Sequence, residues 1–229
     1  MRPMRIDAIL LEVEGIVVDT LVARREAIAD SMRPHGVTLS DAEYWEWCAG
    51  WPTASAIATI ARERDLPLDA TDLELAALRA DRAFATSLSK GTTLADGARS
   101  AIERLSGRHR LAVVSRLPRS VVEVILELAR LDHAFAFVIG AEDAPRAKPD
   151  PAPYHLARQR LGRYRGGASG VVVALENGAA GIRSARAAGF PCLAVGAQPA
   201  HVALEAVGFV PHLAALDTLT LATLIDPPH

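Results

Sequence analysis

Two carboxylates, Glu12 and Glu14, follow a short apolar segment and stand directly before Gly15. Residues i and i+2 of a strand point to the same face, so a strand over residues 6–13 would present both acids together at its end. Gly15 allows the backbone to turn sharply there. Paired acids at the carboxyl end of a strand suit metal and phosphate binding or acid–base chemistry. The structural alternative is a solvated acidic strand end.

Further polar side chains stand just past other apolar segments. Ser115 ends the segment 111–115, and Glu176 and Asn177 follow the segment 171–175. Lys148 lies in a loop before a predicted helix. Parallel strands bring their carboxyl ends to one edge of a sheet, where ligands of open α/β folds bind. Acids for a hard cation, with a hydroxyl and a lysine for an oxyanion, favour phosphoryl-transfer chemistry.

The order of the predicted elements indicates how these residues are positioned. Apolar strands are predicted over 6–13, 111–115, 135–139, 171–175 and 191–195, with helices over 96–105, 118–130, 148–161 and 179–188 between them. This alternation predicts an α/β fold with a parallel sheet covered on both faces. Residues 20–90 show only helical patterns, including a capping box formed by Ser40 and Glu43. They predict a separate, lid-like insert.

The bulk composition excludes several classes of function. The chain has 229 residues, half of them hydrophobic, and a net charge of -2, which argues against general nucleic-acid or membrane-surface binding. No apolar segment approaches the roughly 18 residues of a membrane helix, and the start of the sequence lacks a signal-peptide pattern. Cys48 and Cys192 lie far apart and suggest reduced, buried thiols. We expect a cytoplasmic protein.

The same residues resemble the motifs of the haloacid dehalogenase-like (HAD) hydrolase superfamily, in the branch of beta-phosphoglucomutase and phosphoglycolate phosphatase. The first motif, D-x-D-G-T-x-x-D, is matched by residues 12–19, and the strand that ends in Ser or Thr is matched by Ser115. The lysine before Pro-x-Pro is matched by residues 148–151, and E-D-S-x-x-G with A-x-x-A-G by 176–181 and 185–189. The resemblance implies a Rossmann-like core of residues 1–19 and 91–229 with an all-helical C1 cap of residues 20–90.

The resemblance also implies roles for single residues. Glu12 corresponds to the nucleophile, Glu14 to the general acid and then base, and Lys148 to the residue that holds the nucleophile and the phosphoryl group. The implied cofactor is Mg²⁺, and the implied substrate is a small phosphorylated metabolite. The expected metal ligands are Glu12, Glu14, Glu176 and Asn177, and the expected substrate contacts are Ser115, Arg116, Gly15, Trp51 and Thr53.

The sequence departs from the family pattern at its most important positions. Glu12 and Glu14 replace two aspartates, and each adds about 1.5 Å of side chain. A misplacement of about 1 Å can cost on the order of 100-fold in rate. Asn177 removes one negative charge from the expected metal site, which weakens it, and Thr53 stands where relatives carry a cap arginine, with Trp51 beside it as an aromatic surface.

Two hypotheses follow from these departures. The chain is an atypical Mg²⁺-dependent phosphatase with a glutamate nucleophile, or it is a catalytically silent or repurposed HAD-fold protein that serves as a binding or accessory partner protein in a pathway. The substitutions in the first and fourth motifs favour the second reading. The retention of Ser115, Lys148 and Glu176 favours the first.

Overall fold

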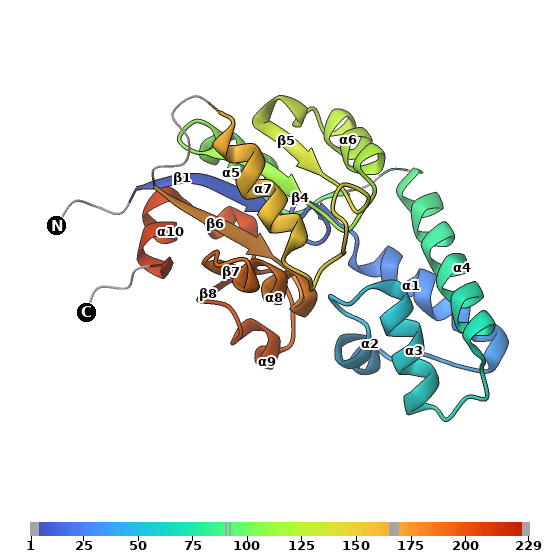
Figure 1. Ribbon diagram of the computed structural model, residues 1–229. Coiled ribbons are helices and arrows are strands. Elements are labelled where there is room, and N and C mark those ends of the chain that lie inside the picture. Colours follow the sequence, from blue (N-terminus) through green and yellow to red (C-terminus); the bar gives the residue numbers. More distant parts are fainter. Residues whose placement is uncertain (1–4, 90, 92, 165–169, 226–229) are drawn as a thin grey trace. The chain divides into compact units, whose positions relative to one another are not determined.

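The computed structural model describes residues 5–89, 91, 93–164 and 170–225. Contacts divide the chain into two compact units (Figure 1). The sheet unit comprises Met1–Val18 and Leu94–His229, and the helical unit comprises Asp19–Thr93. Two short strands, β2 (Val18–Asp19) and β3 (Thr93–Leu94), pair where the chain passes from one unit to the other.

The sheet unit is built around a six-stranded sheet in the order β5-β4-β1-β6-β7-β8. Every neighbouring pair in this sheet is parallel. The chain therefore adds strands on one side of β1 and then returns to add strands on the other side. The bounds are β1 (Ile6–Leu11), β4 (Arg110–Val114), β5 (Phe135–Ile139), β6 (Val171–Glu176), β7 (Cys192–Val195) and β8 (Gly208–Val210).

Helices cover both faces of this sheet. Ala8, Ile9, Leu10 and Leu11 are all fully buried although consecutive strand residues point to opposite faces. This pattern is typical of a parallel sheet between two helical layers, and the predicted α/β fold class is confirmed. The helices of the unit are α5 (Ala98–Ser106), α6 (Arg119–Leu128), α7 (Ala152–Gly162), α8 (Ala179–Ala187), α9 (Ala200–Ala203) and α10 (Thr218–Ile225), with short 3-10 turns at Asp132–Ala134 and Leu213–Ala215.

The first strand is shorter than the sequence pattern predicts. It ends at Leu11 rather than at residue 13. The carbonyl of Val13 accepts the amides of Val17 and Val18 at 2.9 and 3.1 Å, so the backbone closes a turn instead of continuing the ladder. The Glu12 amide still donates to the Leu175 carbonyl of β6 at 3.0 Å, whereas Glu14 follows Val13 where the chain turns, so the same-face argument for a strand does not apply to the pair.

The segment after residue 196 contains β8, α9 and α10, which the sequence pattern does not predict. The strand has three residues and α9 has four. Elements of this length are too short for hydrophobic periodicity to show. Pairing with β7 stabilises β8, through the register Leu193 to Gly208 and Val195 to Val210.

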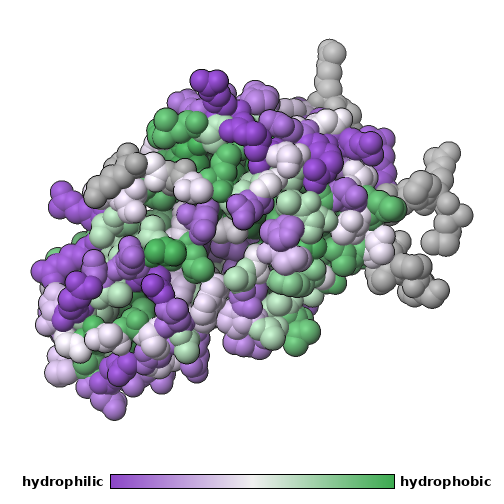
Figure 2. Space-filling model, turned by 180° about the vertical axis from the view of Figure 1, so that it is seen from behind, coloured by the Kyte–Doolittle hydropathy of each residue, from purple (hydrophilic) through white to green (hydrophobic). Residues whose placement is uncertain are grey.

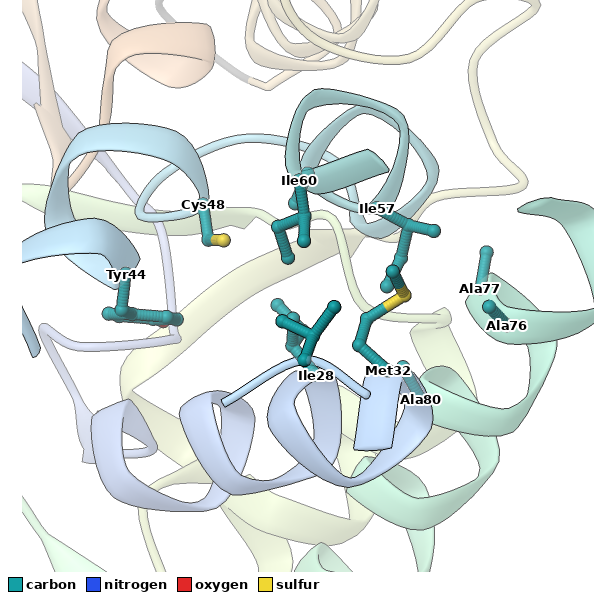
Figure 3. Packing of buried hydrophobic residues seen from close by; sticks show 11 residues of the cluster. Ile28, Met32, Tyr44, Cys48, Ile57, Ile60, Ala76, Ala77 and Ala80 are labelled. Carbon is teal, nitrogen blue, oxygen red and sulfur yellow. The ribbon is translucent and has the colours of Figure 1, made fainter. Parts of the chain in front are cut away.

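The helical unit consists of four α-helices with their own core. The bounds are α1 (Leu21–Met32), α2 (Asp41–Trp47), α3 (Thr53–Glu63) and α4 (Ala70–Ser89), with a 3-10 turn at Arg33–His35. The predicted capping box is confirmed, since the Ser40 hydroxyl accepts the Glu43 amide and the Glu43 carboxylate accepts the Ser40 amide. The side chains at the centre of this core include Ile28, Met32, Tyr44, Cys48, Ile57, Ile60 and Ala80 (Figure 3).

The two cysteines are buried and free, as predicted. Burial raises the pKa of Cys48 to about 12. The face drawn in Figure 2 shows hydrophilic and hydrophobic residues mixed in small patches. In the described part of the chain, no helix is both long enough and apolar enough to cross a membrane.

Candidate active site

The carboxyl ends of three neighbouring strands meet at the point where the strand order reverses. β1 lies between β4 and β6, and Leu11 pairs with Val113 on one side and Leu175 on the other. Glu12, Ser115 and Glu176 therefore lie at one edge of the sheet. This edge is where open α/β sheets bind their ligands.

The Glu12 carboxylate is the centre of the site. One oxygen, Oε1, accepts the Val13 amide at 2.8 Å and the Ser115 hydroxyl at 2.5 Å. The other oxygen, Oε2, accepts the Arg116 amide at 3.2 Å and the Lys148 ammonium at 3.0 Å. Burial acts to raise the pKa of Glu12, but the charges of Lys148 and Arg116 and the Ser115 hydrogen bond outweigh it and hold the pKa below its ordinary value. The carboxylate is ionised and has four donors on its two oxygens.

Lys148 joins the two buried acids. Its ammonium donates to Glu12 Oε2, to the Val114 carbonyl at 2.7 Å and to Glu176 Oε1 at 2.5 Å. The side chain is only 1% exposed. Burial acts to lower the pKa of Lys148, but the two carboxylates outweigh it and raise the pKa. Lys148 is thus a charged group with all three of its hydrogens directed at oxygen atoms.

Tyr154 is a residue of this cluster that we did not predict from the sequence. Its hydroxyl, on the buried side of α7, donates to Glu176 Oε1 at 2.5 Å. Burial and the charge of Glu176 raise the pKa of Tyr154 well above its ordinary value, so it stays a neutral donor. The available signal was the spacing of Tyr154, Ala157 and Leu161, which places the tyrosine on the apolar face of a helix, where a hydroxyl needs a partner.

Glu176 is the buried acid on the far side of Lys148 from Glu12. Burial raises its pKa above the ordinary value, and the attraction of Lys148 offsets this effect only in part. Its second oxygen faces helix α8, where a Cβ at Gly181 would collide with Glu176 Oε2. The carboxylate therefore lies between Lys148, Tyr154 and the backbone of that helix.

Glu14 and Arg116 form the second charged pair of the site. The Glu14 carboxylate is almost fully buried, and the Arg116 guanidinium lies 3.8 Å from its Oε2. Arg116 is thereby placed at the site in two ways, since its backbone amide contacts Glu12 and its side chain contacts Glu14. Arg116 is one of the substrate contacts that the sequence predicts. In the structure its side chain is 14% exposed.

Gly15 and Asn177 pack closely against each other. Gly15 has a φ of +70°, the left-handed region that favours glycine. A Cβ at this position would collide with Asn177 Nδ2. The glycine is therefore required by backbone conformation and by the space that the amide occupies.

In this arrangement the carboxylates of two of the four predicted metal ligands, Glu12 and Glu176, already have partners within the protein. A carboxylate offers about four lone-pair positions, and on Glu12 four donors fill them. Glu176 Oε1 accepts two more donors, and its Oε2 lies against Gly181. Within the described residues, no three His, Cys, Asp or Glu side chains are grouped so that they could hold a metal ion.

The remaining two predicted site residues lie in the helical unit. Trp51 is half-buried in the turn before α3. The Thr53 hydroxyl donates to Asp81 at 2.6 Å and accepts from Arg24 at 3.1 Å. Both hydrogen-bond partners of the Thr53 hydroxyl thus belong to the helical unit. The substrate contacts of Trp51 and Thr53 stay predictions.

Comparison with protein families agrees with this geometry. The model of the haloacid dehalogenase-like hydrolases matches residues 6–189. The chain belongs to this family. The match includes every motif noted in the sequence, from Glu12 to the Gly189 that follows α8.

Two curated relatives of this HAD-like chain are phosphatases by name. A validoxylamine A 7'-phosphate phosphatase from Streptomyces hygroscopicus subsp. limoneus is 29% identical over 188 residues, which cover 80% of this chain and 83% of that protein. A phosphoglycolate phosphatase from Pasteurella multocida is 29% identical over 82 residues, which cover 35% of this chain and only 37% of that protein.

A solved structure shows the same fold at low sequence identity. The beta-phosphoglucomutase from Clostridium difficile superposes with a TM-score of 0.76 at 15% identity, over 96% of this chain and 97% of that chain. At this identity the likeness shows that the two chains share a fold over nearly their whole length. It carries no information about substrate.

Proposed function

We propose that this protein is a phosphoric monoester hydrolase that acts on a small phosphorylated metabolite at the site around Glu12. The observation that carries the proposal is the convergence of the Ser115 hydroxyl, the Arg116 amide and the Lys148 ammonium on one ionised carboxylate. These are the donor types that stabilise phosphoryl oxygens. The names of the two curated relatives support the same substrate class.

In the proposed reaction Glu12 attacks phosphorus as the bond to the ester oxygen breaks. Glu14 donates a proton to the leaving alkoxide and later takes one from the water that hydrolyses the acyl phosphate. Ser115 and Lys148 stabilise the charge on the phosphoryl oxygens. The low pKa of Glu12 supports the role of nucleophile, because the carboxylate is ionised at neutral pH.

Glu12 must change its partners before it can react. In the structure both of its oxygens are held by donors, and the same donors are the ones that a phosphoryl group needs. We therefore propose that turnover is slow relative to an enzyme with aspartate at this position. We also propose that Mg²⁺, which the family resemblance implies, binds weakly in this chain, since Glu12 and Glu176 offer it no free oxygen. The helical unit is proposed to act as the cap.

A second candidate function is that of a catalytically silent member of the family that acts as a binding or accessory protein. The specific observation in its favour is the saturation of Glu12, which leaves the proposed nucleophile without a lone pair directed at a substrate. Glu14 is likewise buried beside Arg116. A silent protein would keep such a cluster for stability alone.

The release of phosphate from an aryl phosphate separates the two candidates. Wild type, Glu12→Gln and the double variant Glu12→Asp/Glu14→Asp are assayed with and without Mg²⁺. Turnover in wild type that is lost in Glu12→Gln supports the hydrolase. An inert wild type with an active double variant supports the silent protein. If none of the three proteins turns over, the phosphatase proposal is wrong.

A further inference from the structure

The donors around Glu12 form a cradle that is shaped for an oxyanion. The cradle consists of the Ser115 hydroxyl, the Arg116 amide and the Lys148 ammonium, and all three lie within 3.2 Å of a Glu12 oxygen. A hydroxyl, a backbone amide and an ammonium are short-range donors that bind phosphate oxygens as well as carboxylate oxygens. In this structure they bind the carboxylate of Glu12, which belongs to the chain itself.

The charges at the site reinforce this arrangement. Three carboxylates, those of Glu12, Glu14 and Glu176, are buried beside two cations, Lys148 and Arg116. A phosphate that entered with Glu12 in place would add further negative charge to a buried site that already holds more acids than bases. Like charges at close range are strongly unfavourable in such a site.

The length of the glutamate places its carboxylate in the cradle. An aspartate at position 12 would end about 1.5 Å closer to the backbone. The shorter acid would withdraw from Ser115 and Lys148 and leave their donors available to another anion. Glu12→Gln, in contrast, would keep the shape of the side chain and fill the same space without the charge.

We propose that the Glu12 carboxylate is a built-in occupant of the oxyanion cradle, which competes with the phosphate group of a ligand and keeps the wild-type site closed to it. This inference rests on the proposed function, because it takes a phosphate ester as the ligand of the cradle. It adds a regulatory contact to that function. Any ligand that binds there must first displace Glu12.

The test is the binding of inorganic phosphate, measured by isothermal titration calorimetry and by the thermal shift that phosphate causes. Glu12→Ala empties the cradle, while Lys148 keeps Glu176 and the Val114 carbonyl as partners, so the remaining ammonium is not left alone. We expect Glu12→Ala to bind phosphate at least about tenfold more tightly than wild type. Phosphate should also raise the melting temperature of the variant more than that of wild type.

Two controls assign the binding to the cradle. Glu12→Gln, which still fills the space, should bind phosphate less tightly than Glu12→Ala. Adding Ser115→Ala to the Glu12→Ala variant should weaken binding again, because one donor of the cradle is lost. If Glu12→Ala fails to fold, Glu12→Asp provides the same comparison and should bind phosphate more tightly than wild type.

The inference is overturned if wild type binds phosphate as tightly as Glu12→Ala or Glu12→Asp. It is also overturned if Ser115→Ala does not weaken the binding gained by Glu12→Ala. The phosphatase proposal stands or falls separately, because phosphate binding to the emptied cradle requires no turnover. A variant that binds phosphate without any hydrolysis in wild type would support the inference and contradict the proposed reaction.

Discussion

Replacing Lys148 with methionine tests whether the buried charge cluster holds the candidate site together. Methionine has a similar length but no charge, so Glu12 and Glu176 would each lose their ammonium partner at 3.0 and 2.5 Å. Removing one partner of a buried ion pair costs about 3–5 kcal/mol, since the remaining charge is buried without compensation. We expect Lys148→Met to lower the free energy of unfolding by this amount at pH 7, a large part of the total stability of a typical domain.

Urea denaturation followed by circular dichroism measures this loss. Fluorescence alone is not sufficient, because the three tryptophans of the chain, Trp45, Trp47 and Trp51, all lie in the helical unit. This distribution is useful as an internal control. If the two units unfold separately, the fluorescence transition, which reports the helical unit, should keep its midpoint in Lys148→Met. The circular dichroism transition of the sheet unit should move to a lower urea concentration.

The loss in free energy of unfolding that Lys148→Met causes should become smaller as the pH falls. In wild type the pKa of Glu12 is lowered on folding, so its stabilising contribution is complete above the unfolded pKa and is lost as the pH falls through the folded pKa. Without Lys148, burial would raise the pKa of Glu12 and raise that of Glu176 further. Acids with raised folded pKa values favour the folded state at low pH. The stability difference between wild type and variant should therefore narrow between about pH 7 and pH 4.5.

An exposed ion pair provides the matched control for this prediction. Arg62 pairs with Glu63, and their side chains are 72% and 41% exposed. Arg62→Met removes a cation from an ion pair in the same way, but we expect a loss of less than about 1 kcal/mol, because solvent screens the pair. Equal losses in the two variants, or a Lys148→Met loss that does not depend on pH, would refute the reasoning.

Two further substitutions test the packing around the site by urea denaturation. Gly15→Ala should cost about 2 kcal/mol or more, because φ is +70° and the new Cβ would collide with Asn177. Gly36→Ala, with a φ of +76° and open space, should cost only about 1 kcal/mol; equal costs would mean that the collision is relieved. Tyr154→Phe removes a donor to the Glu176 carboxylate and should cost about 1.5–3 kcal/mol. No loss would mean that the hydroxyl adds nothing to this cluster.

Much of the fold was predictable from local patterns. The predicted strand over 135–139 agrees with the observed β5, Phe135–Ile139, because a five-residue apolar run that ends at a glycine has the length of a strand and is too short for a helix. The capping box of Ser40 was predictable because its two hydrogen bonds join residues only three apart. Short elements without periodicity, such as β8, were not predictable.

The sequence predicts which residues at the strand ends belong to the site, but not which atoms they contact. The positions of the predicted strand ends place Glu12, Ser115 and Glu176 at one edge of a parallel sheet. The strand pattern could not show that the chain turns directly after Glu12, because the turn forms through the Val13 carbonyl rather than through a side-chain pattern. Tyr154 could not be predicted in the same way, because it lies on the buried face of helix α7 and not at a strand end.

The sequence by itself determined the fold family, through the order of its apolar segments. The polar residues that follow these segments determined the edge of the sheet where chemistry is expected and the types of groups found there. Only the tertiary structure decided what each group contacts. The sequence shows that Glu12 is longer than an aspartate, but the orientation of its carboxylate depends on Ser115 and Lys148, which lie 103 and 136 residues further along the chain. Hydrogen bonds and charge attraction act through space over a few ångströms, so the partners that hold Glu12 are set by the folding of the sheet and not by any spacing along the chain.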